Sequence, residues 1–127
     1  ELLNDDTKKR LVVENDDSPN EYSVKDLVNG VHLRIGIPIT FDYFHHKFNT
    51  GGLTEEEALI VASATWPEGV TQCCHYSESR QKEQLDESIR PQAHSDLIYE
   101  KIQTYGLEPD IVIEAKLKEQ AIFKRVI

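Results

Sequence analysis

The stretch PITFDYFHH (residues 38–46) joins a strand-forming half to an ionisable half. Its apolar and β-branched residues predict a buried strand over residues 38–44. Asp42, His45 and His46 fall within five positions at its end. These ionisable residues indicate either a solvated loop or one wall of a metal site. The rest of the sequence is needed to choose between the two.

Strands and helices are predicted to alternate on both sides of this stretch. Ser23 with Asp26, and Thr54 with Glu57, form the capping-box pattern that starts helices. Gly36 and Gly106 are typical C-terminal stops. Strands are expected at 10–15, 38–44, 70–77 and 110–116, and helices at 24–35, 55–66, 94–106 and from 118 onward.

This βαβαβαβα order predicts an α/β fold. Near-continuous apolar strands that alternate with helices are typical of a parallel sheet with helices packed against it. The 127 residues suit one domain, residues 1–127. The pattern alone fits either a doubly wound sheet or a segment of a barrel with about four βα units.

Bulk composition narrows the function classes. The net charge of −9, with 23 acidic and 14 basic residues, argues by itself against a nucleic-acid surface, although bound cations at a carboxylate site would reverse the charge locally. No apolar run reaches the roughly 20 residues of a membrane span, so no membrane partner is expected. The only cysteines are neighbours, which favours a reducing, intracellular setting. Because the chain begins with Glu1 and has no Met, we expect it to be a piece of a longer protein.

Ionisable residues stand at the C-terminal end of each expected strand, where ligands bind in open α/β sheets and in barrels. Each alone has an ordinary explanation as a solvated strand end, a cap or a surface histidine. Their joint occurrence in four successive units favours one metal site, and carboxylates with imidazoles suit Mn²⁺, Zn²⁺ or Fe²⁺ in hydrolysis. The rim residues are Glu14, Asp42, His45, His75 and Glu114, with His94 as a further imidazole from a loop.

Other residues near these strand ends are weaker candidates. Lys116 and Lys118 either meet phosphates or only solvate the start of a helix. By alternation Cys73, His75 and Ser77 share one face of their strand, while Cys73 and Cys74 are most simply explained as small packing residues.

Six segments occur in an order that resembles the UV-damage endonucleases (the UvdE family). They are RLVVENDD, IPITFDYFHH, TW, HYS, the HSD that begins at His94, and IEAKLKE. The resemblance runs from Arg10 to the end of the chain. Some members place a lysine two positions before the HYS histidine, where this chain has Cys73.

The resemblance implies a metal-dependent endonuclease. The family is similar to endonuclease IV, a TIM barrel with divalent metals, often manganese or zinc and up to three, at its C-terminal rim. It nicks double-stranded DNA immediately 5′ to ultraviolet photoproducts in excision repair; for a bacterial protein this would place it in the cytoplasm. Carried over by position, the metal ligands are Glu14, Asp42, His45, His75, His94 and Glu114, and the phosphate or supporting residues are Asn15, Asp17, His46, Ser77, Lys116 and Lys118.

By this resemblance the chain corresponds to the C-terminal half of a (β/α)₈ TIM barrel. The expected partner is then the N-terminal half of the barrel or, for a half that stands alone, a second copy held through open sheet edges and an exposed apolar inner face. Two alternatives stay open: a sugar isomerase of the xylose-isomerase type on a similar barrel, and a half-barrel that binds metal without catalysis.

Overall fold

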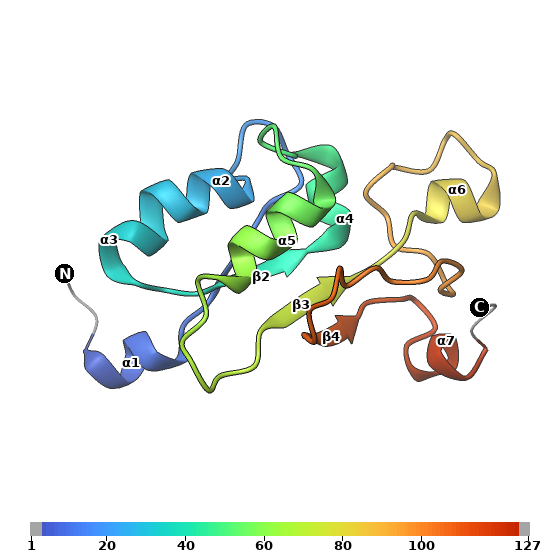
Figure 1. Cartoon of the computed structure of the whole chain (residues 1–127). Helices are drawn as coiled ribbons and strands as arrows, with labels where there is room; N and C mark the ends of the chain where they lie inside the picture. Colours follow the sequence, from blue (N-terminus) through green and yellow to red (C-terminus); the bar gives the residue numbers. More distant parts are fainter. Residues whose placement is uncertain (1–3, 125–127) are drawn as a thin grey trace.

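A four-stranded parallel sheet forms the centre of the molecule (Figure 1). The computed structural model describes residues 4–124. Within that range the sheet order follows the chain order, and the strands are β1(Val13–Glu14), β2(Ile39–Asp42), β3(Cys73–Tyr76) and β4(Asp110–Ile113). Each strand lies inside a predicted one, which confirms the α/β class, the parallel sheet and the four βα units of a partial TIM-type barrel.

The first strand is shorter than predicted because a helix precedes it. The helix α1(Asp5–Arg10), which was not predicted, includes residue 10. Its signals are local: the Asn4 side chain accepts a hydrogen bond from the Thr7 amide, acidic residues fill the first turn and basic residues the last.

The helices after the two capping boxes form as predicted. At Ser23 and at Thr54 both reciprocal hydrogen bonds of the capping box are present. The first starts a continuous helical stretch, α2(Val24–Leu27), the π-helical η1(Val28–His32) and α3(Leu33–Ile35), which ends at Gly36 in the left-handed conformation (φ 74°). The second starts α5(Glu55–Ser63), which stops three residues before the predicted end.

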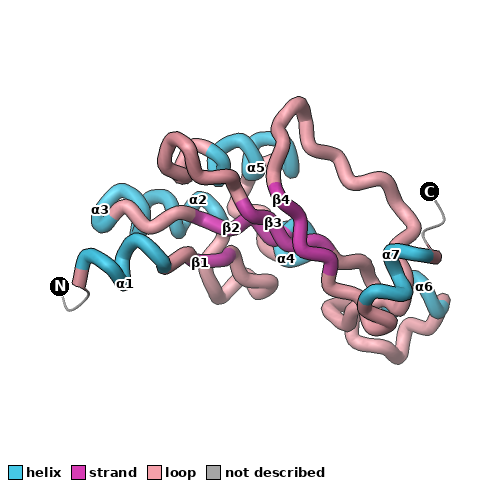
Figure 2. Tube along the Cα trace, turned by 90° about the horizontal axis from the view of Figure 1, so that it is seen from below, coloured by secondary structure: helices cyan, strands magenta, loops and turns pink. Residues whose placement is uncertain are grey.

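The hydrophobic core lies on the face of the sheet that α2 and α5 cover (Figures 1 and 2). Ile39 and Phe41 of β2 point to this face and are 0 % exposed. The alternate residues point the other way, and Asp42, His75 and Val112 face each other there across three strands. This face therefore carries two of the predicted rim residues, Asp42 and His75.

The helix expected at 94–106 is wrong. Residues 94–109, all of which the structure describes, form turns and irregular backbone, while α6(Arg80–Gln84) lies in the preceding polar segment. Carboxylates replace the helical hydrogen bonds: Glu78 accepts from the amides of Tyr99 and Glu100, and Glu83 accepts from those of Asp96 and Leu97. Beyond β4, α7(Glu119–Phe123) confirms the start of the final predicted helix.

Candidate metal centre

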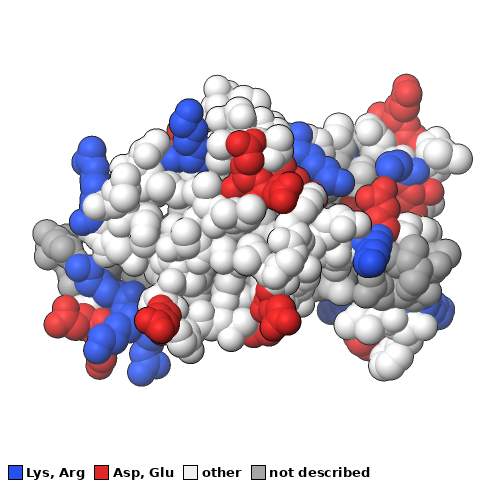
Figure 3. Space-filling model, in the orientation of Figure 1, with Lys and Arg blue, Asp and Glu red and all other residues white. Residues whose placement is uncertain are grey.

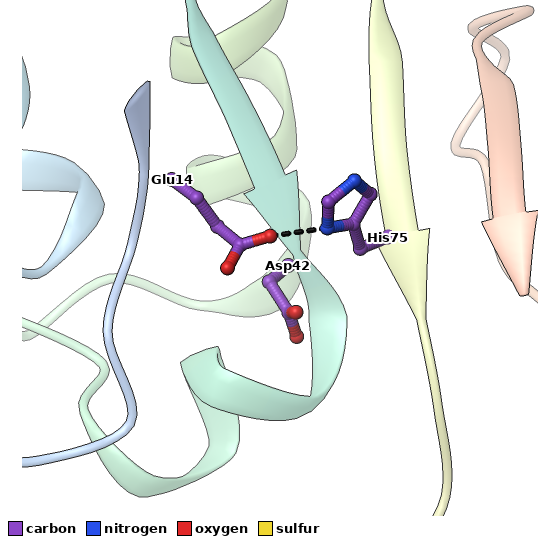
Figure 4. A group of neighbouring side chains, drawn as sticks. All are labelled: Glu14, Asp42 and His75. Atoms are coloured by element: carbon purple, nitrogen blue, oxygen red, sulfur yellow. Dashed lines mark ion pairs between the residues drawn. The ribbon is translucent and has the colours of Figure 1, made fainter. Parts of the chain in front are cut away.

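Glu14, Asp42 and His75 come together at the carboxyl ends of β1, β2 and β3 (Figure 4). Each offers one ligand atom, and these atoms lie within 4.8 Å of one another. The sheet register brings them together, because Asp42 pairs with His75 and Glu14 pairs with Thr40, two positions before Asp42. Three residues that are 28 and 33 positions apart in sequence therefore share one small volume.

Asp42 ends β2 and caps the helix α4(Tyr43–Phe48). The predicted strand to Phe44 is thus wrong at its end: the Oδ1 atom of Asp42 accepts from the amides of Phe44 and His45 at 2.9 and 2.8 Å, which turns the chain into a helix. Asn15 fixes the same residue from β1's side, accepting from the Asp42 amide at 2.8 Å and donating to its carbonyl at 3.0 Å.

The second carboxylate oxygen of Asp42 is available for a ligand. Asp42 is 1 % exposed, and its Oδ2 atom has no hydrogen-bond partner among the described residues. Burial is the main cause that raises the pKa of Asp42, and the nearby carboxylates of Glu14 and Glu114 add to it. A buried carboxylate oxygen without a donor is costly, and a cation would remove that cost.

His45 borders the cluster from the first turn of α4. Its Nδ1 atom lies 2.7 Å from the Asn15 carbonyl oxygen, 3.5 Å from Asp42 Oδ2 and 3.6 Å from Glu14 Oε1. Because a carbonyl only accepts, Nδ1 carries the proton and Nε2 is left as the atom for a ligand. Burial lowers the pKa of His45, but the Asn15 carbonyl and the carboxylates of Asp42 and Glu14 outweigh it, so the pKa is raised overall.

Glu114 borders the cluster from the side of β4. The Nδ1 atom of His75 forms an ion pair with Glu14 and lies 3.6 Å from Glu114 Oε1. The Glu114 amide donates to the Tyr76 carbonyl at 2.8 Å, so the backbone continues the β3–β4 pairing to this point. The five rim residues predicted on strands therefore gather at one end of the sheet, three as a tight group and two at its border.

His94 is not one of the three clustered ligand residues. It is not at a helix start, as predicted, but in a bridge to Ser79, and its ring packs on Phe44 with centroids 5.9 Å apart. With Lys116 it lines a separate small pocket, which also includes Arg90. Arg90 was not a sequence candidate, and nothing in its spacing sets it apart from the other charges of residues 78–93.

The remaining predicted site residues differ in their burial and in their contacts. His46 is 4 % exposed and packs on Phe41, and burial lowers its pKa. Ser77 is buried, and its hydroxyl has no partner among the residues that the structure describes. Asp17 is half-buried, and Lys118 is exposed before α7.

A parallel α/β sheet whose strand ends gather carboxylates and imidazoles defines an α/β protein with a candidate divalent-metal site. The model of the family "UV-endonuclease UvdE" matches residues 1–126. The chain belongs to this family.

Curated relatives and a solved structure agree with this assignment. The chain is 36 % identical to the "UV-damage endonuclease" of Schizosaccharomyces pombe over 96 % of its own length and 20 % of that protein. It is 31 % identical to the "UV DNA damage endonuclease" of Bacillus pumilus over 94 % of its length and 38 % of that protein. The crystal structure of SacUVDE superimposes with a TM-score of 0.74 at 31 % identity, covering 94 % of this chain and 39 % of that one. The chain thus spans well under half the length of these relatives.

Among the described residues, none of the helices combines the length and the apolar character that crossing a bilayer requires.

Proposed function

We propose that the protein acts as a metal-dependent UV-damage endonuclease. Its substrate would be double-stranded DNA with ultraviolet photoproducts, and the reaction would be hydrolysis of the phosphodiester 5′ to the lesion in excision repair. Damaged, poorly stacked bases cost less to extrude from the duplex, which gives a physical basis for selectivity. The names of the relatives support the DNA substrate.

The Oδ2 atom of Asp42, which accepts no hydrogen bond from the described residues and lies beside Glu14 and His75, is the observation that carries the metal part of this proposal. Three acidic or imidazole ligand atoms within 4.8 Å, one of them on a buried carboxylate, fit a divalent cation. The donor set has no thiolate, which suits manganese or zinc. We assign the ions to Glu14, Asp42 and His75, with His45 and Glu114 as ligands at the border; His94 remains a ligand only by family resemblance.

The chain's own residues would prepare the site. Asn15 holds the Asp42 backbone in place, and its carbonyl keeps the proton of His45 on Nδ1, which leaves Nε2 as the ring nitrogen with a free electron pair. Divalent ions held there would supply Lewis-acid activation of water and charge stabilisation on the phosphate.

The open edges of the sheet are the places where further strands of a barrel could pair. In the described residues β1 and β4 each pair on one side only. We propose that further βα units, those of an N-terminal half-barrel, pair with these edges, because unpaired strand edges invite partners.

The test is the variant Asp42→Asn with Asp110→Asn as its matched control. Asn also caps helices well, so Asp42→Asn keeps the start of α4 while removing the anionic ligand. Asp110 is exposed at the opposite end of β4. We expect Asp42→Asn to lose Mn²⁺ or Zn²⁺ binding by calorimetry and to lose EDTA-sensitive nicking of irradiated plasmid, with unirradiated plasmid as the blank. Nicking retained in Asp42→Asn would remove this residue from the mechanism.

A further inference from the structure

Two cavities lie beside the carboxyl ends of the strands, and their charges differ. The larger, about 560 Å³, is bounded by α4, α6 and residues 91–100, and it has both lysines and glutamates on its walls. One of these lysines, Lys82, already pairs with Glu100 at 3.2 Å. The smaller, about 230 Å³, is lined by Arg90, Gln92, Ala93, His94 and Lys116, and it has no acidic residue on its wall.

The cations of the smaller pocket are unpaired. Within residues 4–124 neither Arg90 nor Lys116 makes a side-chain hydrogen bond or an ion pair, in contrast with Arg80, which lies 2.6 Å from Asp96. The protein as a whole carries −9, so a pocket lined by two cations and no acidic residue differs from the average charge of the chain. On the face shown in Figure 3, basic side chains lie in small groups beside acidic ones, with a wide uncharged area between them.

The backbone builds this pocket from two different loops. Residue 94 is held against residue 79 by the hydrogen bonds from Arg80 to Ala93 and from Ser95 to Glu78. On the other side, the Lys116 amide donates to the Ser95 carbonyl at 2.9 Å. The loop after β3 and the loop after β4 are therefore fixed to each other, which sets Arg90 and His94 opposite Lys116 without a ligand.

We propose that this pocket binds one backbone phosphate of the DNA substrate, next to the phosphate that reacts at the metal centre. Arg and Lys are the usual phosphate donors, and Gln92 and His94 add polar groups to the wall. The volume is smaller than that of pockets for drug-sized ligands and is sufficient for a phosphate group. Lys116 lies two residues beyond Glu114, at the border of the metal cluster, so the two sites lie on the same edge of the sheet.

This inference rests on the proposed function for the identity of the ligand, but its first test does not need catalysis. Inorganic phosphate is titrated into isotope-labelled protein in EDTA, and amide shifts are followed by NMR. The pocket variant is Arg90→Gln with Lys116→Gln; the control is Lys25→Gln with Arg34→Gln, which removes the same charge from the exposed surface of α2 and α3. Thermal unfolding of both checks that the fold is kept.

We expect phosphate to shift the amides of residues 90–94 and 116. The pocket variant, which lacks both cations, should bind phosphate at least about tenfold more weakly, the effect of losing one or more charge-assisted hydrogen bonds. The control should bind as the parent does. Equal affinity in both variants, or shifts confined to residues around Glu14, Asp42 and His75, would overturn the pocket as an anion site.

The second test identifies the anion as a DNA phosphate. Binding of a photoproduct-containing duplex is measured by fluorescence anisotropy over a salt series in EDTA. The slope of log K against log salt should fall in magnitude by about 1 in the pocket variant and stay unchanged in the control. An unchanged slope in the pocket variant would overturn the assignment to DNA. Absence of nicking with Mn²⁺, by contrast, would count against the proposed function and leave both binding tests in force.

Discussion

Two stretches that both follow a central strand are stabilised in different ways. After β2, the chain enters α4 and α5, and each helix begins at a residue whose side chain caps it: Asp42 and Thr54. After β3, the chain runs through residues 77–109 with only α6 as regular structure. Glu78 and Glu83 hold that connection by accepting hydrogen bonds from amides 13 to 22 residues away.

The difference is one of distance along the chain between the groups that form the stabilising hydrogen bonds. A cap and the amide it satisfies are three residues apart, so the sequence displays both partners together. A carboxylate that binds amides about 20 residues away leaves no such pattern. The second stretch also contains the apolar spacing of a helix, Leu97, Ile98 and Ile102, but only Ile98 is fully buried.

The largest expected effect compares one buried residue from each stretch. Leu59 of α5 and Ile98 of the connection are both 0 % exposed. Large-to-alanine changes in a core cost about 2–5 kcal/mol, depending on how well the site collapses. We expect Leu59→Ala at the upper end, because a helix packed on the sheet cannot close the cavity, and Ile98→Ala nearer about 2 kcal/mol. Urea unfolding measures both, and an equal or larger cost for Ile98→Ala would show that the connection is as rigid as the helical layer.

The next largest effect removes a carboxylate that holds the connection. Glu78 is 8 % exposed and accepts from the Tyr76 hydroxyl as well as from the Tyr99 and Glu100 amides. Glu78→Gln should lower the free energy of unfolding by about 1.5–3 kcal/mol, the range for charge-assisted hydrogen bonds. Hydrogen exchange at the amides of 99 and 100 should accelerate. The matched control is Glu87→Gln, an exposed change in the same connection; similar losses in both would contradict the special role of Glu78.

The sequence predicts the parts of this fold that depend on neighbours in the chain. Both capping boxes, the stop at Gly36 and the centres of all four strands are confirmed. The end of the second strand was placed two residues late, because Asp42 reads as a strand-end ligand and also acts as a cap. The helix at 94–106 was wrong because its amides have stronger acceptors in Glu78 and Glu83 than in their own carbonyls.

The candidate site was predictable in its rim residues and less so in its surroundings. Placing acidic and imidazole residues at successive strand ends was enough to bring Glu14, Asp42 and His75 together. The clamp by Asn15 and the pocket with Arg90 depend on which loops meet in space. Neither contact has a spacing that a single sequence displays.

A smaller effect is expected from the cap of α5, in the stretch that follows β2. Thr54→Ala removes the hydroxyl that accepts from the Glu57 amide at 3.1 Å. The expected cost is about 1 kcal/mol, typical for a lost N-cap. Thr71→Ala, at an exposed position outside the helices, serves as the control. Thermal unfolding of the pair measures the difference, and no difference would mean that packing of α5, and not its cap, stabilises this stretch.

The smallest effect contrasts how the two stretches respond to pH. Burial raises the pKa of Asp42 above its usual 3.8, so the folded state holds that proton more tightly and, without metal, gains stability as pH falls. The pKa of Glu83 is lowered below 4.5: its burial acts the other way, but the hydrogen bonds from Asp96, Tyr99 and Leu97 outweigh it. Its stabilisation is present above pH 4.5 and is lost as pH falls through the lowered value.

Two variants separate these opposite slopes. In EDTA, unfolding free energies from about pH 7 to about pH 3 should fall less steeply in Glu83→Gln than in the parent, because the variant has no carboxylate there to protonate. Asp42→Asn should fall more steeply, because it loses the group that gains stability in acid. If both variants shifted the pH profile in the same direction, the two carboxylates would share one electrostatic environment. The contrast between the stretch after β2 and the stretch after β3 would then not hold.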